Sequence, residues 1–290
     1  DAKENGLQRR IVFSGDLGLR DRPILRDPDV VNDTDYLIIE STYGDREHNH
    51  DRSVEDQLVK VVRETAARGG HVVIPVFAVE RAQELLFYFS RLYRTGRLPP
   101  LPIFLDSPMA VRITEVFRRH RECFDQETQS LIENDQSPFN FPNLRLVTTV
   151  EESKQINTFN VPSVIMATSG MCTAGRIKFH LRSNIVRPES TILFVGYQSR
   201  GTLGRQILDG NPYVRIHGKE WPTRARIEQI HGLSGHADRQ ALLSWLSEIK
   251  SMVRSVFVTH GEENAALNFA ETIRTQFGWR TSVPQYLDEV

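Results

Sequence analysis

The middle of the chain alternates between amphipathic stretches with helical periodicity and short apolar stretches that have the length of β-strands. Consecutive strands separated by helices run parallel, because each helix returns the chain to the edge of the sheet where the previous strand began. Residues 51–212 are therefore predicted to form an α/β domain with helices on the faces of a parallel sheet. The helices are expected at 54–68, 80–95, 111–120 and 126–134, and the strands at 71–77, 102–105, 145–148, 163–167 and 191–195.

The pattern changes after residue 212. Short strands are predicted at 213–217 and 225–230 with no helix between them, which is typical of antiparallel pairing. A helical pattern follows at 239–250, and 281–283 is the last predicted strand. The end of the chain is therefore expected to belong to a different architecture from the middle.

Two histidines of this last segment lie in turns that lead from strands into helices. His236 lies in Ser234-Gly-His-Ala-Asp238, and His260 directly follows an apolar strand. Such turns can aim both imidazoles into one cleft, as metal and phosphate sites require. Either histidine alone is more often a helix cap or a core residue of an unrelated α/β protein. The presence of both histidines, each in its own motif, is what indicates a functional site.

Two acidic residues follow apolar strands near the start of the chain. Asp16 follows the strand that begins at Ile11, and Glu40 follows the apolar residues 36–39. A carboxylate in the position of Glu40 is expected to be partly buried and therefore to need a partner. Asp16 on its own is more often a turn residue than a ligand.

Two of the loops that follow the predicted parallel strands, at residues 168–176 and 196–205, are rich in glycine. In such sheets ligands lie beyond the carboxyl ends of the strands, where backbone N–H groups and arginines can meet phosphates. The first loop lacks the Lys-Ser/Thr of a nucleotide-binding P-loop. Asp106 ends another strand and is either a ligand or a helix entry. The candidate phosphate contacts are Ser169, Gly170, Arg176 and Arg200.

The composition limits the classes of protein that fit. The net charge of −1 gives no overall basic field for nucleic acid, although 30 of the 36 basic residues are arginines, which suit phosphate oxygens. Two cysteines, Cys123 and Cys172, exclude a disulfide framework. Because no apolar stretch approaches 18 residues and the start lacks the apolar core of a signal peptide, we expect a cytoplasmic protein with no membrane partner.

The stretch from Glu47 to Asp51 looks like the start of a zinc motif because it contains His48 and His50. The motif H-x-H-x-D-H requires Asp and His at the next two positions, where this chain has Arg52 and Ser53. We therefore interpret the stretch as a solvated loop.

Seven short motifs, taken together and in this order, resemble the β-CASP branch of the metallo-β-lactamase superfamily. The likeness is greatest to bacterial and archaeal homologues of the endonuclease that cleaves eukaryotic pre-mRNA 3′ ends. The motifs are Phe13-Ser-Gly-Asp16-Leu-Gly, Glu40-Ser-Thr-Tyr-Gly, Phe104-Leu-Asp-Ser-Pro-Met-Ala110, Ser169-Gly-Met, Gly201-Thr-Leu-Gly-Arg205, Ser234-Gly-His236-Ala-Asp and Thr259-His260-Gly-Glu.

This resemblance implies a domain organisation. Residues 1–50 and 213–290 are expected to form part of a metallo-β-lactamase αββα sandwich, into which the parallel β-CASP domain of residues 51–212 is inserted. It also implies a zinc-dependent RNA phosphodiesterase with two zinc ions in a complete site and single-stranded RNA as substrate. Dimers are common among relatives, which makes a homodimer one expected state.

The resemblance further implies a role for each of four residues. Asp16 and His260 correspond to zinc ligands of the family, and Asp16 is in addition part of the catalytic centre. His236 corresponds to the histidine beside the scissile phosphate, which contacts the phosphate and can protonate the leaving oxygen. Glu40 corresponds to the acid that orients His236.

One departure from the family is large. The H-x-H-x-D-H ligands and a further metal histidine of the family precede the aspartate of Ser-Gly-Asp, and no residue before Asp16 can replace them. Because zinc usually takes three or four protein ligands, Asp16 and His260 alone are not expected to hold two ions tightly. The sequence therefore predicts the carboxyl-terminal portion of a longer ribonuclease, inactive in isolation.

Two other functions stay open. A non-catalytic binding or scaffold subunit is disfavoured because such paralogues typically lose their acidic and histidine motifs, although an ancestral loss of the earlier ligands would leave this same sequence. A DNA-repair nuclease is disfavoured because relatives of that type commonly have valine where this chain has His260.

Overall fold

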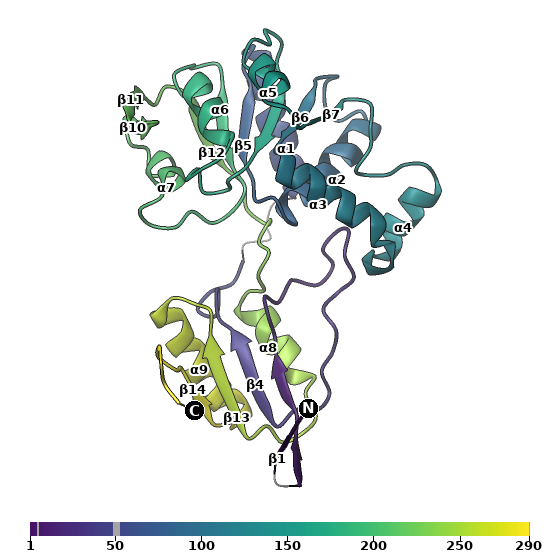
Figure 1. Cartoon of the computed structure of the whole chain (residues 1–290), viewed down its shortest axis with the longest axis vertical. Coiled ribbons are helices and arrows are strands. Elements are labelled where there is room, and N and C mark those ends of the chain that lie inside the picture. The colour runs from purple at the N-terminus through teal and green to yellow at the C-terminus, as the bar shows by residue number, and fades with distance from the viewer. Residues whose placement is uncertain (5, 49–52, 290) are drawn as a thin grey trace. The chain divides into compact units, whose positions relative to one another are not determined.

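The computed structural model describes residues 1–4, 6–48 and 53–289, which divide into two compact units. The smaller unit comprises residues 1–22, 27–48 and 234–290, and the larger unit comprises 23–26 and 49–233. Each is built around its own sheet (Figure 1). None of the helices in the described part of the chain is both long and apolar enough to span a membrane.

The larger unit contains a six-stranded sheet in the order β12-β9-β5-β8-β6-β7, and every pair of neighbours in it runs parallel. The strands are β5 (Val72–Pro75), β6 (Ile103–Asp106), β7 (Leu144–Val147), β8 (Val164–Ala167), β9 (Thr191–Phe194) and β12 (Arg226–Gln229). The helices are α1 (Val54–Ala67), α2 (Arg81–Arg94), α3 (Pro108–Arg119), α4 (Gln126–Glu133), α5 (Val150–Ile156), α6 (Ile177–Asn184) and α7 (Leu203–Leu208), with a 3₁₀ turn at Arg121–Cys123.

Helices cover both faces of this sheet, which explains why its central strands are apolar throughout. In β5, Val72 and Ile74 belong to the core that includes α1 and α2, whereas Val73 points into the core on the side of α6 and α7. This alternation follows from the two-residue period of a strand. The predicted parallel α/β sheet is therefore confirmed.

One prediction about the end of the larger unit was wrong. Residues 225–230 were expected in antiparallel pairing, but β12 pairs parallel with β9. A short hairpin, β10 (Tyr213–Ile216) and β11 (Lys219–Pro222), is antiparallel and lies within the crossover from β9 to β12, which also contains α7. Because of this pairing the compact units divide at residues 233 and 234, whereas the expected boundary was at 212 and 213.

The smaller unit contains a four-stranded sheet in the order β14-β13-β4-β3, also parallel. Its strands are β3 (Ile11–Phe13), β4 (Tyr36–Glu40), β13 (Ser255–Thr259) and β14 (Thr281–Ser282), and a separate hairpin joins β1 (Ala2–Glu4) to β2 (Leu7–Arg9). The core packs α8 (Arg239–Ser247) and α9 (Glu263–Phe277) against the sheet. All four sheet strands therefore present their carboxyl ends at one edge, where β3, β4 and β13 carry the predicted site residues.

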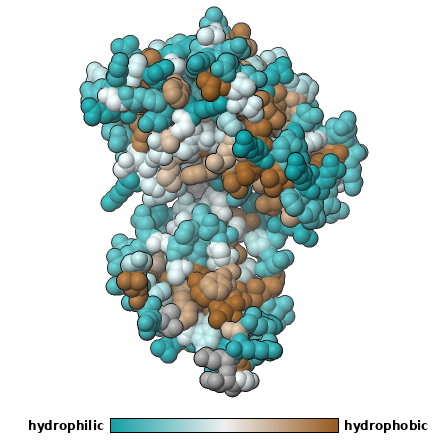
Figure 2. Space-filling model, in the orientation of Figure 1, coloured by the Kyte–Doolittle hydropathy of each residue, from teal (hydrophilic) through white to brown (hydrophobic). Residues whose placement is uncertain are grey.

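The surface shows a mixture of polar and apolar side chains. Figure 2 shows apolar atoms gathered over the part of the larger unit where α3 lies. Met109 and Val116 of this helix are exposed, at 64% and 47%. Exposed apolar groups of this kind can form binding surfaces.

Candidate metal and catalytic site

Parallel pairing of β4 with β13 sets the geometry of the site. Glu40 and Thr259 are partners in the register, so the residues that follow them leave the sheet side by side. The chains come so close that a Cβ on Gly261 would lie 2.4 Å from the Ser41 Oγ. The Thr42 hydroxyl donates a hydrogen bond to the His260 backbone oxygen at 3.0 Å. Glycine at position 261 is therefore required for His260 to reach this place.

Asp16 reaches the same place from β3. The strand ends at Phe13, and Gly15 adopts a positive φ of 57° that reverses the chain before the aspartate. The Asp16 Oδ1 lies 3.3 Å from the His260 Nδ1, and both side chains are more than half exposed. Each therefore presents its polar atoms to solvent as well as to the other.

Glu40 and His236 form the buried side of the site. The Glu40 side chain is 1% exposed, and its Oε2 lies 2.9 Å from the His236 Nδ1. Its other oxygen accepts the backbone N–H of Leu17. An ionised carboxylate is an acceptor only, so the His236 Nδ1 is the donor. This fixes the tautomer and the plane of the imidazole.

Asp16, His236 and His260 form a cluster that fits a metal ion. One potential ligand atom from each lies within 4.8 Å of the other two. A carboxylate and imidazoles are the ligands that zinc prefers when thiolates are absent. The cluster offers three groups that can bind a metal, and the Nδ1 of one of them, His236, already donates a hydrogen bond to Glu40. Three such groups suit one metal ion better than two. In the part of the chain that the structure describes, the donor groups that meet here are therefore those of Asp16, His236 and His260.

Thr42 and His48 belong to this neighbourhood but were not predicted from the sequence. The Thr42 Oγ1 lies 3.4 Å from the Nδ1 atoms of both His236 and His260. The His48 Nε2 lies 3.1 Å from the His236 backbone oxygen, and the His48 N–H donates to Asp238. His48 therefore supports the loop that carries His236. The rest of the suspected zinc motif, residues 49–51, lies outside the described residues.

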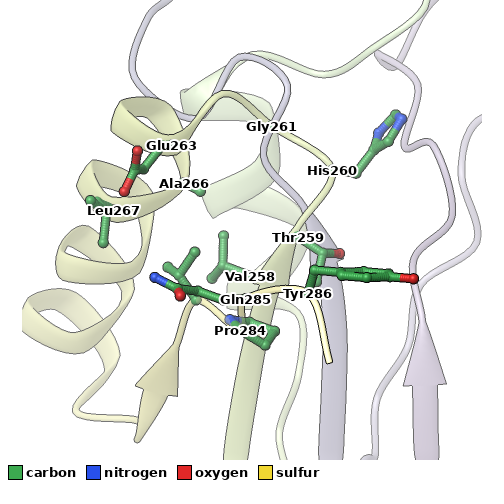
Figure 3. Close-up of a pocket in the computed structure, with 11 residues that line it drawn as sticks. Val258, Thr259, His260, Gly261, Glu263, Ala266, Leu267, Pro284, Gln285 and Tyr286 are labelled. Carbon is green, nitrogen blue, oxygen red and sulfur yellow. The ribbon is translucent and has the colours of Figure 1, made fainter. Parts of the chain in front are cut away.

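A pocket of about 470 Å³ adjoins His260. Figure 3 shows it between α9 and the segment that follows β14, with the His260 ring pointing away from its interior. Its lining is mixed, with Val258, Leu267 and Pro284 beside Thr259, Glu263 and Gln285.

The four predicted phosphate contacts lie in the larger unit, at the carboxyl edge of its sheet. The Ser169 Oγ accepts the backbone N–H groups of Thr173 and Ala174 at 3.1 and 3.3 Å. Gly170 is buried and Arg200 is exposed. We call residues 168–176, which follow β8, the glycine loop. The side chain of Ser169 therefore holds this loop closed.

Arg176 is tied to a buried carboxylate. Its Nη1 lies 2.6 Å from the Asp106 Oδ1, and its Nη2 donates to the Thr148 backbone oxygen at 2.8 Å. Burial raises the pKa of Asp106, but hydrogen bonds from His180 and Ser153 and the nearby charges outweigh burial, so this pKa lies below its ordinary value. Asp106, left open between ligand and helix entry, thus anchors the glycine loop.

Comparison with known domain families gives two matches in the chain. Residues 82–207 match the Beta-Casp domain, and residues 221–284 match the Zn-dependent metallo-hydrolase RNA specificity domain. The first match covers most of the parallel sheet, and the second contains both histidine turns.

Known proteins are similar over nearly the whole chain. Ribonuclease TTHA0252 from Thermus thermophilus is 41% identical over 90% of this chain and 59% of its own length. Transcription termination factor FttA from Methanocaldococcus jannaschii is 36% identical over 88% of this chain and 41% of its own length. An RNase J-like protein from the same organism is 30% identical over 96% of this chain and 63% of its own length. The chain thus spans less than two thirds of each of these relatives, and it belongs to the β-CASP branch of the metallo-β-lactamase superfamily.

Proposed function

We propose that this chain is the carboxyl-terminal portion of a zinc-dependent RNA phosphodiesterase, with endo- or exonuclease activity. The observation that carries the proposal is the convergence of Asp16, His236 and His260, with Glu40 buried behind His236. A scaffold role would not require a buried carboxylate that orients a partly buried imidazole at a cluster of metal-binding groups.

Asp16 and His260 are the residues that would hold zinc from this chain. When bound, zinc supplies a Lewis acid that lowers the pKa of water and offsets negative charge on phosphoryl oxygens. The incomplete ligand set agrees with the partial coverage of the relatives, whose additional length can provide the remaining ligands. Two zinc ions per complete site are part of this proposal.

His236 holds a proton for the leaving oxygen. Because Glu40 accepts from the Nδ1, the Nε2 is the nitrogen left to face a substrate. The negative charge of Glu40 favours the imidazolium, which can contact a phosphate and then release its Nε2 proton. Glu40 acts through His236 and is therefore a positioning residue.

Single-stranded RNA is the substrate that we propose, with Ser169, Gly170, Arg176 and Arg200 as phosphate contacts. The matched domain is described as an RNA specificity domain, and one relative is a ribonuclease. His260 in place of the valine expected for DNA-repair relatives supports the same choice. Because Arg176 already binds Asp106, its contribution is expected to be partly through the shape of the loop.

Cleavage of end-labelled RNA by the longer enzyme tests the proposal. His236→Ala is expected to lower the rate about 10²–10⁴-fold without loss of zinc, the range for a general acid. His231→Ala is the matched control, since His231 is exposed and bonds to Gln57 only through its backbone. Equal cleavage of DNA of the same sequence, or full activity of His236→Ala, would contradict the assignment.

A further inference from the structure

Exposed side chains with apolar surfaces follow three strands of the larger sheet at its carboxyl edge. Phe77 follows β5 and is 44% exposed, Tyr197 follows β9 and is 45% exposed, and Met109 follows β6 and is 64% exposed. We call these three residues the edge strip. Large apolar groups are rarely left exposed in a row unless something binds to them.

The order of the strands places the edge strip in a line. β5 pairs with β9 on one side and with β8 on the other, and β8 pairs with β6. Neighbouring strands lie about 4.8 Å apart. Tyr197 and Phe77 therefore follow adjacent strands, and the glycine loop after β8 lies between Phe77 and Met109.

The Phe77 ring rests directly on the glycine loop. A Cβ on Gly170 would lie 2.7 Å from the Phe77 Cδ2, so only glycine allows the ring to lie there. Nearly half of the Phe77 side chain nevertheless stays exposed. One side of the ring is therefore supported by protein while the rest is presented to solvent.

Hydrogen bonds hold the loops beneath the strip together. The Gln198 amide donates to the Gly170 backbone oxygen at 3.0 Å, and the Gly204 N–H donates to the Met171 backbone oxygen at 3.1 Å. The loop that carries Tyr197 is thus fixed to the loop on which Phe77 rests. Because these two loops are already held in place, ligand binding does not incur the entropic cost of ordering them.

We propose that the edge strip stacks the unpaired bases of single-stranded RNA, with the strand crossing the sheet edge from β9 towards β6. Every nucleobase has a face that can stack on an aromatic ring, and phosphates between the bases require a nearby cation. Arg200, which is exposed and three residues beyond Tyr197, provides that cation. This inference rests on the proposed function and adds a base-binding surface to it.

The flanking groups favour RNA over an apolar protein partner. The glycine loop and Arg200 border the strip, and Val79, two residues beyond Phe77, is also exposed. Figure 2 shows apolar atoms near α3 surrounded by hydrophilic ones. Two exposed aromatic rings with one cation nearby suit stacked bases joined by a phosphate.

Binding of labelled single-stranded RNA to the 290-residue chain, followed by fluorescence anisotropy, tests the inference. Phe77→Leu and Tyr197→Leu are each expected to weaken binding about ten-fold, and Phe77→Trp is expected to preserve it. The matched control is Phe179→Leu, because Phe179 is 46% exposed in the same unit but lies on α6 against His217. An oligonucleotide of abasic ribose phosphates should bind all of these variants equally.

The outcomes separate this inference from the proposed function. If unmodified RNA binds Phe77→Leu and Phe179→Leu with equal affinity, the strip does not stack bases, although the nuclease assignment stands. If abasic and normal RNA lose the same affinity in Phe77→Leu, the residue acts on the loop and not on bases. If the unaltered chain and the longer enzyme both fail to bind RNA, the proposed function itself fails.

Discussion

At the scale of single residues, Glu40 is the clearest example of how a buried charge can direct chemistry. Its carboxylate is 1% exposed and is hydrogen-bonded to His236 and to the backbone of Leu17. A buried carboxylate without partners would be costly, so these two bonds explain how it is tolerated. They also leave Glu40 no free oxygen with which to bind a metal without losing a partner.

Glu40→Gln keeps the size of the side chain but removes its charge. We expect cleavage by the longer enzyme to fall about 10–100-fold, the usual effect of losing an orienting partner, while zinc content stays unchanged. Glu47→Gln is the control, since Glu47 is exposed and pairs with Arg239 at the surface. A loss of zinc in Glu40→Gln would instead assign Glu40 to the metal.

The residues of the site could be predicted from the sequence only in part. Asp16, His236 and His260 were predicted and the structure brings them together, although their roles stay predictions. Thr42 was not predicted, and His48 was interpreted as part of a solvated loop, because the contacts of both depend on tertiary packing. His48, for example, contacts a residue 188 positions away, which no local pattern reveals.

At the scale of secondary-structure elements, periodicity predicted the positions of helices α1 to α4 and of every strand of the larger unit except β11, but it gave no range for α5, α6 or α7. It failed at β12, which was expected to be antiparallel because no helix was predicted before it, although it pairs parallel with β9. The crossover from β9 to β12 was not predicted because it contains the hairpin of β10 and β11, and β11 itself was not predicted. The length and composition of a segment indicate that it is a strand. Whether it pairs parallel or antiparallel depends on the edge of the sheet to which the connecting segment returns the chain.

The Asp106 cluster ties three elements of the larger unit together. Asp106 ends β6, accepts from Ser153 of α5, and lies 2.6 Å from the His180 Nε2 of α6, while Arg176 just before α6 pairs with its other oxygen. We expect Asp106→Asn to lower the free energy of unfolding by about 3 kcal/mol, because breaking a buried ion pair leaves its partners uncompensated. Urea denaturation checks this value. Asp209→Asn, which removes an exposed pair with Arg205, should cost less than about 1 kcal/mol.

The same cluster determines a pH dependence. The pKa of Asp106 is lower in the folded state than its ordinary value of 3.8, so its contribution is complete above that value. It should be lost as the pH falls through the folded pKa. The difference in stability between the unaltered chain and Asp106→Asn is therefore expected to shrink below about pH 3.8. A difference that is constant from pH 7 to pH 2 would show that shape, not charge, gives the effect.

At the scale of the whole molecule, the chain corresponds to only part of the length of its relatives. It spans 59% of one ribonuclease relative and 41% of a termination factor. Its smaller unit brings Asp16, His236 and His260 together, and of these Asp16 and His260 are the residues that we propose as zinc ligands. We therefore expect metal binding, and not folding, to be the property that this chain lacks by itself.

Zinc stoichiometry of the purified chain, measured by native mass spectrometry, tests that expectation. Since zinc sites usually have three or four protein ligands, we expect at most one ion, held loosely and lost on dialysis. His260→Ala should abolish this residual binding, whereas His231→Ala should not change it. Two ions retained after dialysis would mean that other residues complete the site, with His48 and His50 as the first to substitute. In that case the ligand set would be complete within these 290 residues, and the chain should cleave RNA without any added segment.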